Sequence, residues 1–172
     1  MEKRYKHFVY SALFMLTFFL GLSQGAKFKK HAHYGFTVEL PEEMRLRKMF
    51  DEVSPEASLD YGDYEVIFKD KDIRIEFHSL IVSRYGCLNV QECYDMALNE
   101  SNLEITYKYL GENYFVISGI NKNNGNIYYW KSLVPDDPFY IHDMVIEYNE
   151  KRKSYIEKYI GRISKSFQED SD

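Results

Sequence analysis

The chain has 172 residues, with 22 Lys and Arg against 27 Asp and Glu and a formal net charge of −5 at pH 7. This balance argues against nucleic acid as a partner, because affinity for nucleic acid comes mainly from neutralising phosphates. It also provides no polybasic patch for an anionic membrane surface. The aromatic content of 17%, the four prolines and the lack of low-complexity tracts indicate a globular protein.

Residues 1–25 have the three parts of a secretory signal peptide. A basic start precedes an apolar run from Phe8 to Leu22. That run is about 15 residues long, shorter than the roughly 20 that span a bilayer core. A small residue at Gly25 fits a signal peptidase site, so we expect cleavage between Gly25 and Ala26 and no stable membrane insertion afterwards. The alternative is an uncleaved N-terminal anchor.

The first half of the mature chain predicts three strands. Residues 26–33 are interpreted as a flexible N-terminal tail. Apolar and polar residues alternate over 36–40, which predicts a strand that ends at a proline. Residues 41–63 are irregular and polar, and a second strand is expected over 64–69. The clearest alternation in the chain then predicts a third strand over 73–82.

A short helix is expected over residues 90–100. Asn89 is a good N-cap residue, and Glu92 lies three positions later, as in a capping box. Val90, Tyr94 and Ala97 follow at helical spacing, which indicates one apolar face.

Four strands in a meander are expected next, over residues 105–109, 114–120, 127–134 and 139–148. In the first of them, Ile105, Tyr107 and Tyr109 alternate with polar neighbours. The hairpin between the second and third is marked by Asn123-Asn124-Gly125, because Asn and Gly tolerate positive φ.

A C-terminal helix is expected over residues 151–167, followed by a disordered acidic tail over 168–172. Its apolar residues form one stripe that must pack on a sheet: Ile156, Tyr159, Ile160, Ile163 and Phe167. The element order predicts a single α+β domain over residues 34–167, an antiparallel sheet of about six to seven strands with packed helices.

Several local patterns resemble a known fold family. The early segment reads YGFTVELPEEM, and the last helix ends in Ser-x-Ser-Phe, at Ser164, Ser166 and Phe167. Together with the element order, these features resemble the PsbP-like or Mog1-like fold over nearly all of residues 34–167. The resemblance implies an exported bacterial protein that is a binding or assembly module rather than an enzyme, and it transfers no functional residue to this chain.

Cys87 and Cys93 are the only cysteines. Export delivers proteins to oxidising compartments, where paired thiols tend to form disulfides. A disulfide here would fix the corner between strand and helix, with a gain of about 2 kcal/mol because the closed loop is short. The alternative is two separate buried thiols.

Catalytic, cofactor and metal motifs are not found in the sequence. His31 and His33 are interpreted as part of the N-terminal tail, and His78 and His142 as residues of the sheet. The acidic residues around position 65 do not have the spacing of a calcium-binding loop. We therefore predict no catalytic residue, no metal site and no cofactor.

Five aromatic residues flank one predicted hairpin: Tyr128, Tyr129, Trp130, Phe139 and Tyr140. Because side chains alternate across a strand, some of them must point away from the main core. They form a candidate interaction surface. The alternative is that helices cover both faces of the sheet and all five are core.

The sequence favours an exported, periplasmic or secreted, non-enzymatic domain that binds or helps to assemble a protein partner in the cell envelope. One alternative is a small-ligand or metal-binding periplasmic domain, which requires a deep apolar pocket with converging polar groups. Another is a hydrolase with a dispersed site, which a strained Ser or Cys beside a His would favour. The sequence predicts no oligomeric state.

Overall fold

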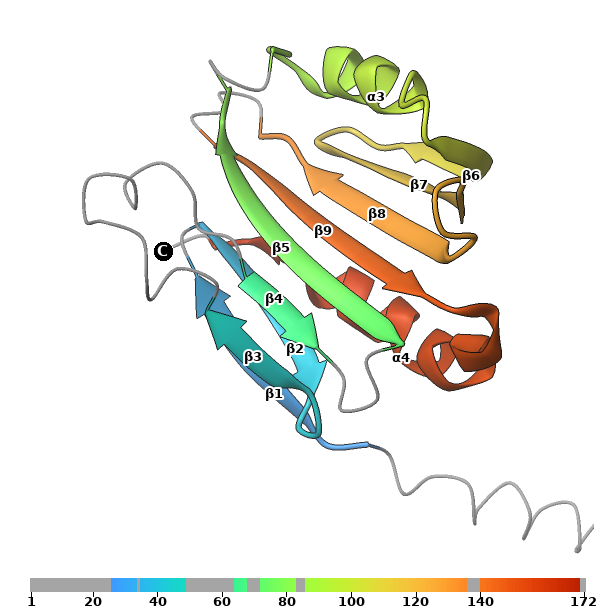
Figure 1. The fold of residues 1–172 in the computed structure, drawn as a ribbon. Helices are drawn as coiled ribbons and strands as arrows, with labels where there is room; N and C mark the ends of the chain where they lie inside the picture. Colours follow the sequence, from blue (N-terminus) through green and yellow to red (C-terminus); the bar gives the residue numbers. More distant parts are fainter. Residues whose placement is uncertain are drawn as a thin grey trace, which may run out of the picture.

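The computed structural model describes residues 26–33, 35–48, 64–67, 72–82, 86–135 and 140–170. These residues form two antiparallel sheets and two α-helices (Figure 1). The α+β class predicted from the sequence is therefore confirmed. The predicted signal peptide, with Gly25 at its end, and Phe139 lie outside the described residues.

The larger sheet has seven strands in the order β3-β4-β5-β9-β8-β7-β6. All neighbours are antiparallel. The strands are β3 (Arg45–Lys48), β4 (Tyr64–Ile67), β5 (Ile73–Ile81), β6 (Leu103–Leu110), β7 (Tyr114–Asn121), β8 (Ile127–Leu133) and β9 (Tyr140–Tyr148). All of them except β3 were predicted from the sequence.

A smaller sheet joins the two ends of the domain, in the order β1-β2-β10. β2 (Phe36–Pro41) lies in the middle, and β1 (Phe28–His33) and β10 (Gln168–Glu169) pair with its two edges. The prediction of a flexible tail over 26–33 and a disordered tail over 168–172 is thus wrong where these strands form. Most side chains of β1 and β10 are polar, so these segments have no alternating apolar pattern. Backbone pairing with β2 holds both strands in place.

The main core lies between the larger sheet, β2 and α4 (Lys153–Ser166). The alternating residues Ile73, Ile75 and Phe77 of β5 are at most 1% exposed and face this core. The 3₁₀ turn η1 (Glu150–Arg152) precedes α4, and the predicted apolar stripe of the helix packs as expected.

A second core lies on the other face of the sheet, under α3 (Val90–Leu98) (Figure 1). Asn89 caps this helix by accepting a hydrogen bond from the Glu92 backbone N–H at 3.0 Å. The Glu92 carboxylate in turn accepts from the Leu88 backbone N–H at 2.8 Å and from the Asn89 amide at 2.9 Å. The predicted N-terminal cap is confirmed.

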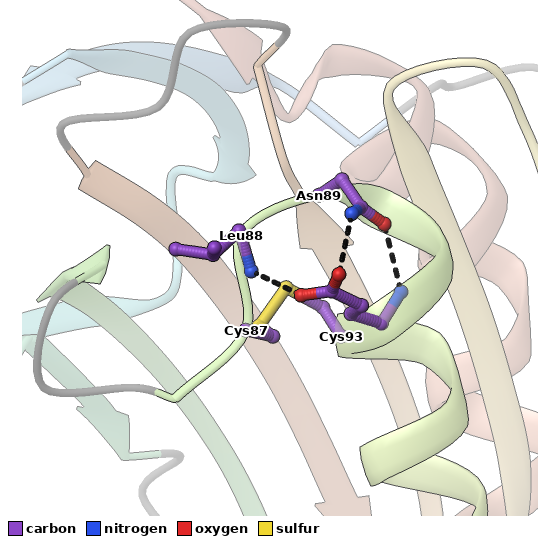
Figure 2. Close-up of a disulfide and its surroundings, with 5 residues drawn as sticks. Cys87, Leu88, Asn89 and Cys93 are labelled. Atoms are coloured by element: carbon purple, nitrogen blue, oxygen red, sulfur yellow. Dashed lines mark hydrogen bonds between the residues drawn. A yellow bond between two sulfur atoms is a disulfide. The ribbon is translucent and has the colours of Figure 1, made fainter.

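Cys87 and Cys93 form a disulfide at the start of α3 (Figure 2). Both residues are fully buried, and their Cα atoms are 5.1 Å apart. The disulfide and the Asn89 cap therefore fix the same corner, where the chain enters α3. No helix in the described part of the chain is long and apolar enough to cross a membrane.

Candidate functional site

The two helices cover different parts of the larger sheet. α3 packs on β6 and β7 from one face. On the opposite face, α4 reaches β8, where the hydroxyls of Tyr129 and Ser164 are hydrogen-bonded at 2.6 Å. Beyond α4, this face of β6 and β7 forms one wall of an open groove of about 510 Å³.

Four of the described residues that line the groove are tyrosines. The residues of the sheet that line it are Tyr107, Tyr109, Tyr114, Val116, Tyr129 and Lys131, and those of α4 are Ile160, Gly161, Ser164 and Lys165. Tyr107 and Tyr109 are 54% and 45% exposed, which is unusual for side chains of this size. We call this feature the tyrosine groove.

A β-bulge in β6 turns these two tyrosines into the groove. Ile105 pairs with Gly119 and Tyr107 pairs with Ser118, so Thr106 is an extra residue in the strand. Ile105 consequently packs into the second core, whereas Tyr107 points to the opposite face. The alternation predicted for Ile105, Tyr107 and Tyr109 is broken at this point.

Two tyrosines of the groove, Tyr114 and Tyr129, have a pKa raised above its ordinary value, so their hydroxyls stay protonated at neutral pH. A hydrogen bond with Tyr109 and, to a lesser extent, burial raise the pKa of Tyr114. The two rings are tilted against each other, with their centroids 5.6 Å apart. Burial raises the pKa of Tyr129 as well. The groove thus offers neutral phenols with both donor and acceptor capacity.

Lys131 lies at the floor of the groove and is 8% exposed. Its Nζ donates to the backbone carbonyls of Ser164 and Phe167, both at 2.8 Å, and lies 5.1 Å from the centroid of the Tyr114 ring. These carbonyls close the C-terminal end of α4, where the helix dipole favours a cation. Burial lowers the pKa of Lys131 to about 8.

This pKa predicts a specific pH dependence of stability. Above pH 8 the folded protein has released the Lys131 proton, while the unfolded chain still binds it up to about pH 10.5. The free energy of unfolding of the wild type should therefore rise with pH relative to that of Lys131→Met, by up to about 1.4 kcal/mol per pH unit. Urea unfolding of both proteins between pH 7 and about 9.5 measures the difference, and the other titrating groups, which both proteins share, cancel in it. If the free energies of unfolding of the two proteins change in parallel with pH, burial does not lower the pKa of Lys131.

The predicted interaction surface is divided between the two faces of the sheet. Tyr128 is 2% exposed and lies in the second core, where Trp130 also packs, with its ring 5.7 Å from that of Phe115. Tyr129 points into the tyrosine groove. Tyr140 is half-buried and stacks on His142 at 6.3 Å.

Ser79 and His142 form a buried polar pair in the main core. The Ser79 hydroxyl and His142 Nδ1 are 2.8 Å apart, and each residue is 4% exposed. Gly35 lies over the ring, since a Cβ at that position would be 2.9 Å from Nε2. Each residue thus provides the other with a hydrogen-bond partner inside the core.

Within the described residues, no group of three or more His, Cys, Asp or Glu side chains is arranged to hold a metal ion. His31, predicted to lie in a tail, is part of β1, where it pairs with Val38. Burial lowers the pKa of His31, with a smaller contribution from the charge of Lys29.

Comparison with known proteins gives matches among solved structures. No protein-family model matches the chain, and neither does any curated protein. The Ran-binding protein Mog1p of Saccharomyces cerevisiae has a TM-score of 0.53 at 10% identity, with 84% of this chain and 96% of Mog1p covered.

Two further structures are similar. A Mog1 single-site mutant has a TM-score of 0.52 at 10% identity, with 83% of this chain and 95% of that chain covered. Cyanobacterial PsbP (CyanoP) from Synechocystis has a TM-score of 0.44 at 9% identity, with 87% and 96% covered. The chain therefore has the PsbP/Mog1-like fold that the sequence resemblance predicted, and at these identities the similarity shows the fold alone.

Proposed function

We propose that the protein is an exported, non-enzymatic domain that binds a protein partner of the cell envelope in the tyrosine groove. The observation that carries this proposal is the exposure of Tyr107 and Tyr109 beside an open groove of about 510 Å³. Tyrosine is enriched in protein interfaces, because its ring supplies contact area and its hydroxyl a hydrogen bond at low cost in conformational entropy.

Other features support parts of this proposal. The composition of residues 1–25 favours export. The Cys87–Cys93 disulfide is compatible with an oxidising compartment. Among proteins of this fold, Mog1p is named for binding the protein Ran, which provides a precedent for protein recognition.

Small-molecule binding is the alternative, because the groove volume lies within the range of ligand pockets. Such pockets usually enclose most of the ligand, whereas Tyr107 and Tyr109 leave this groove open to solvent. An open aromatic surface fits a protein segment better.

Crosslinked capture from the envelope fraction of the native host tests the proposal. The wild type is compared with Tyr107→Ser/Tyr109→Ser and with the control Leu88→Ser/Met96→Ser, which changes two exposed apolar residues on and beside α3. We expect one stoichiometric partner with the wild type and the control, and a loss of at least about 10-fold with the tyrosine variant. Equal capture by all three proteins contradicts the role of the groove.

The same mass spectra measure the N-terminus of the protein isolated from the host. A mature species that begins at Ala26 is expected. A species that retains residues 1–25 contradicts cleavage.

A further inference from the structure

Among the described residues that line the tyrosine groove, the charges are all of one sign. Lys131 and Lys165 are two of these ten residues and none of the ten is acidic, in a chain with a formal net charge of −5. Within the described residues, neither lysine forms an ion pair with a carboxylate. An ammonium group has three N–H donors, and the backbone carbonyls take two of those of Lys131. The groove is thus complementary to an anion.

Gly161 leaves the α4 side of the groove without a side chain at this position. It lies inside α4, where glycine costs about 1 kcal/mol relative to alanine. A Cβ at this position would meet no atom within 4 Å, so the packing does not require a glycine. The missing side chain leaves room for another backbone to approach the helix closely.

We propose that the occupant of the tyrosine groove is an extended acidic segment of the protein partner. A carboxylate of this segment lies against Lys131 and Lys165, and an adjacent apolar side chain packs on Tyr107 and Tyr109. The segment backbone passes Gly161. This inference rests on the proposed function and adds the chemistry of the partner.

Nucleic acid and carbohydrate fit the groove less well than an acidic peptide segment does. Nucleic acid needs many phosphate contacts, and two of the described residues that line the groove are lysines. Sugar hydroxyls need good acceptors, whereas the lining side chains that the structure describes include no carboxylate and no amide.

Fluorescence anisotropy with short labelled peptides tests the inference. The probe is a peptide of alternating Glu and Leu, and the matched peptide has Gln in place of every Glu. We expect the acidic peptide to bind the wild type about 10-fold more tightly than the amide peptide and to weaken as salt is added.

Two pairs of variants give the matched controls. Gly161→Glu and Gly161→Gln narrow the groove equally and differ only in charge, and position 161 has open space around it. The acidic peptide should bind Gly161→Glu about 10-fold more weakly than Gly161→Gln. Lys165→Glu should weaken binding relative to Lys165→Gln in the same direction, because Lys165 is exposed at the rim. Circular dichroism checks that all four variants are folded.

Three results overturn the inference. If both peptides bind equally, or if neither binds while envelope capture still depends on Tyr107 and Tyr109, the acidic segment is wrong and the proposed function stands. If neither peptide binds and soluble oligosaccharides bind in a way that depends on the tyrosines, both the inference and the proposed function fail.

Discussion

Replacing Gly119 by alanine is expected to lower the free energy of unfolding by about 3 kcal/mol or more. A Cβ at this position would lie 1.8 Å from the backbone oxygen of Glu104 and 3.1 Å from the Cα of Ile105. Both atoms belong to the backbone at the bulge of β6, so no rotation of a side chain relieves the clash. β6 must move away from β7, and the tyrosines of the groove move with it.

Urea unfolding, followed by circular dichroism, measures this effect. The control is Gly161→Ala, which has no atom within 4 Å of the new Cβ and should raise stability by about 0.5–1 kcal/mol. If Gly119→Ala is as stable as the wild type, β6 does not pair with β7 in the register described.

Replacing Phe167 by alanine should destabilise the protein by about 3–5 kcal/mol. The Phe167 side chain is fully buried, and its ring centroid lies 5.2 Å from that of Phe36 and 5.7 Å from that of Phe77. These three rings connect the end of α4 to β2 and β5. Truncation leaves a cavity that a packed core closes only in part.

Phe167→Leu keeps most of the apolar volume. It should lower the free energy of unfolding by less than half as much as Phe167→Ala does. Both variants leave intact the backbone carbonyl that accepts from Lys131, so the comparison isolates the ring. Thermal and urea unfolding give the values. A loss below about 1 kcal/mol for Phe167→Ala would mean that the three rings do not form one core.

The sequence predicted the elements that bury apolar side chains at a regular period. β5 and α4 have clear patterns, and the Asn89 cap marks the start of α3. β1 and β10 were missed because backbone pairing with β2, which lies far from β10 along the chain, holds their polar residues in place. Such pairing leaves no periodic signal in the strand itself.

The tyrosine groove could not be predicted for two physical reasons. A one-residue bulge reverses the face on which every later side chain of β6 lies, and nothing in the sequence around Thr106 indicates it. The exposure of Tyr107 and Tyr109 also depends on how far α4 extends across the sheet, which is a tertiary property. Tyr129 was identified as an exposed aromatic candidate, but its neighbours in the strand point to the other face.

The position of β2 between the first and last strands of the domain constrains the order of folding. Phe36 pairs with His33 on one side and with Glu169 on the other. The first pairing is local and can form early in folding, whereas the second closes a loop that includes nearly the whole domain. The small sheet is therefore completed late, after Gln168 and Glu169 have reached β2. Until then, β2 presents an open edge that a chaperone can bind.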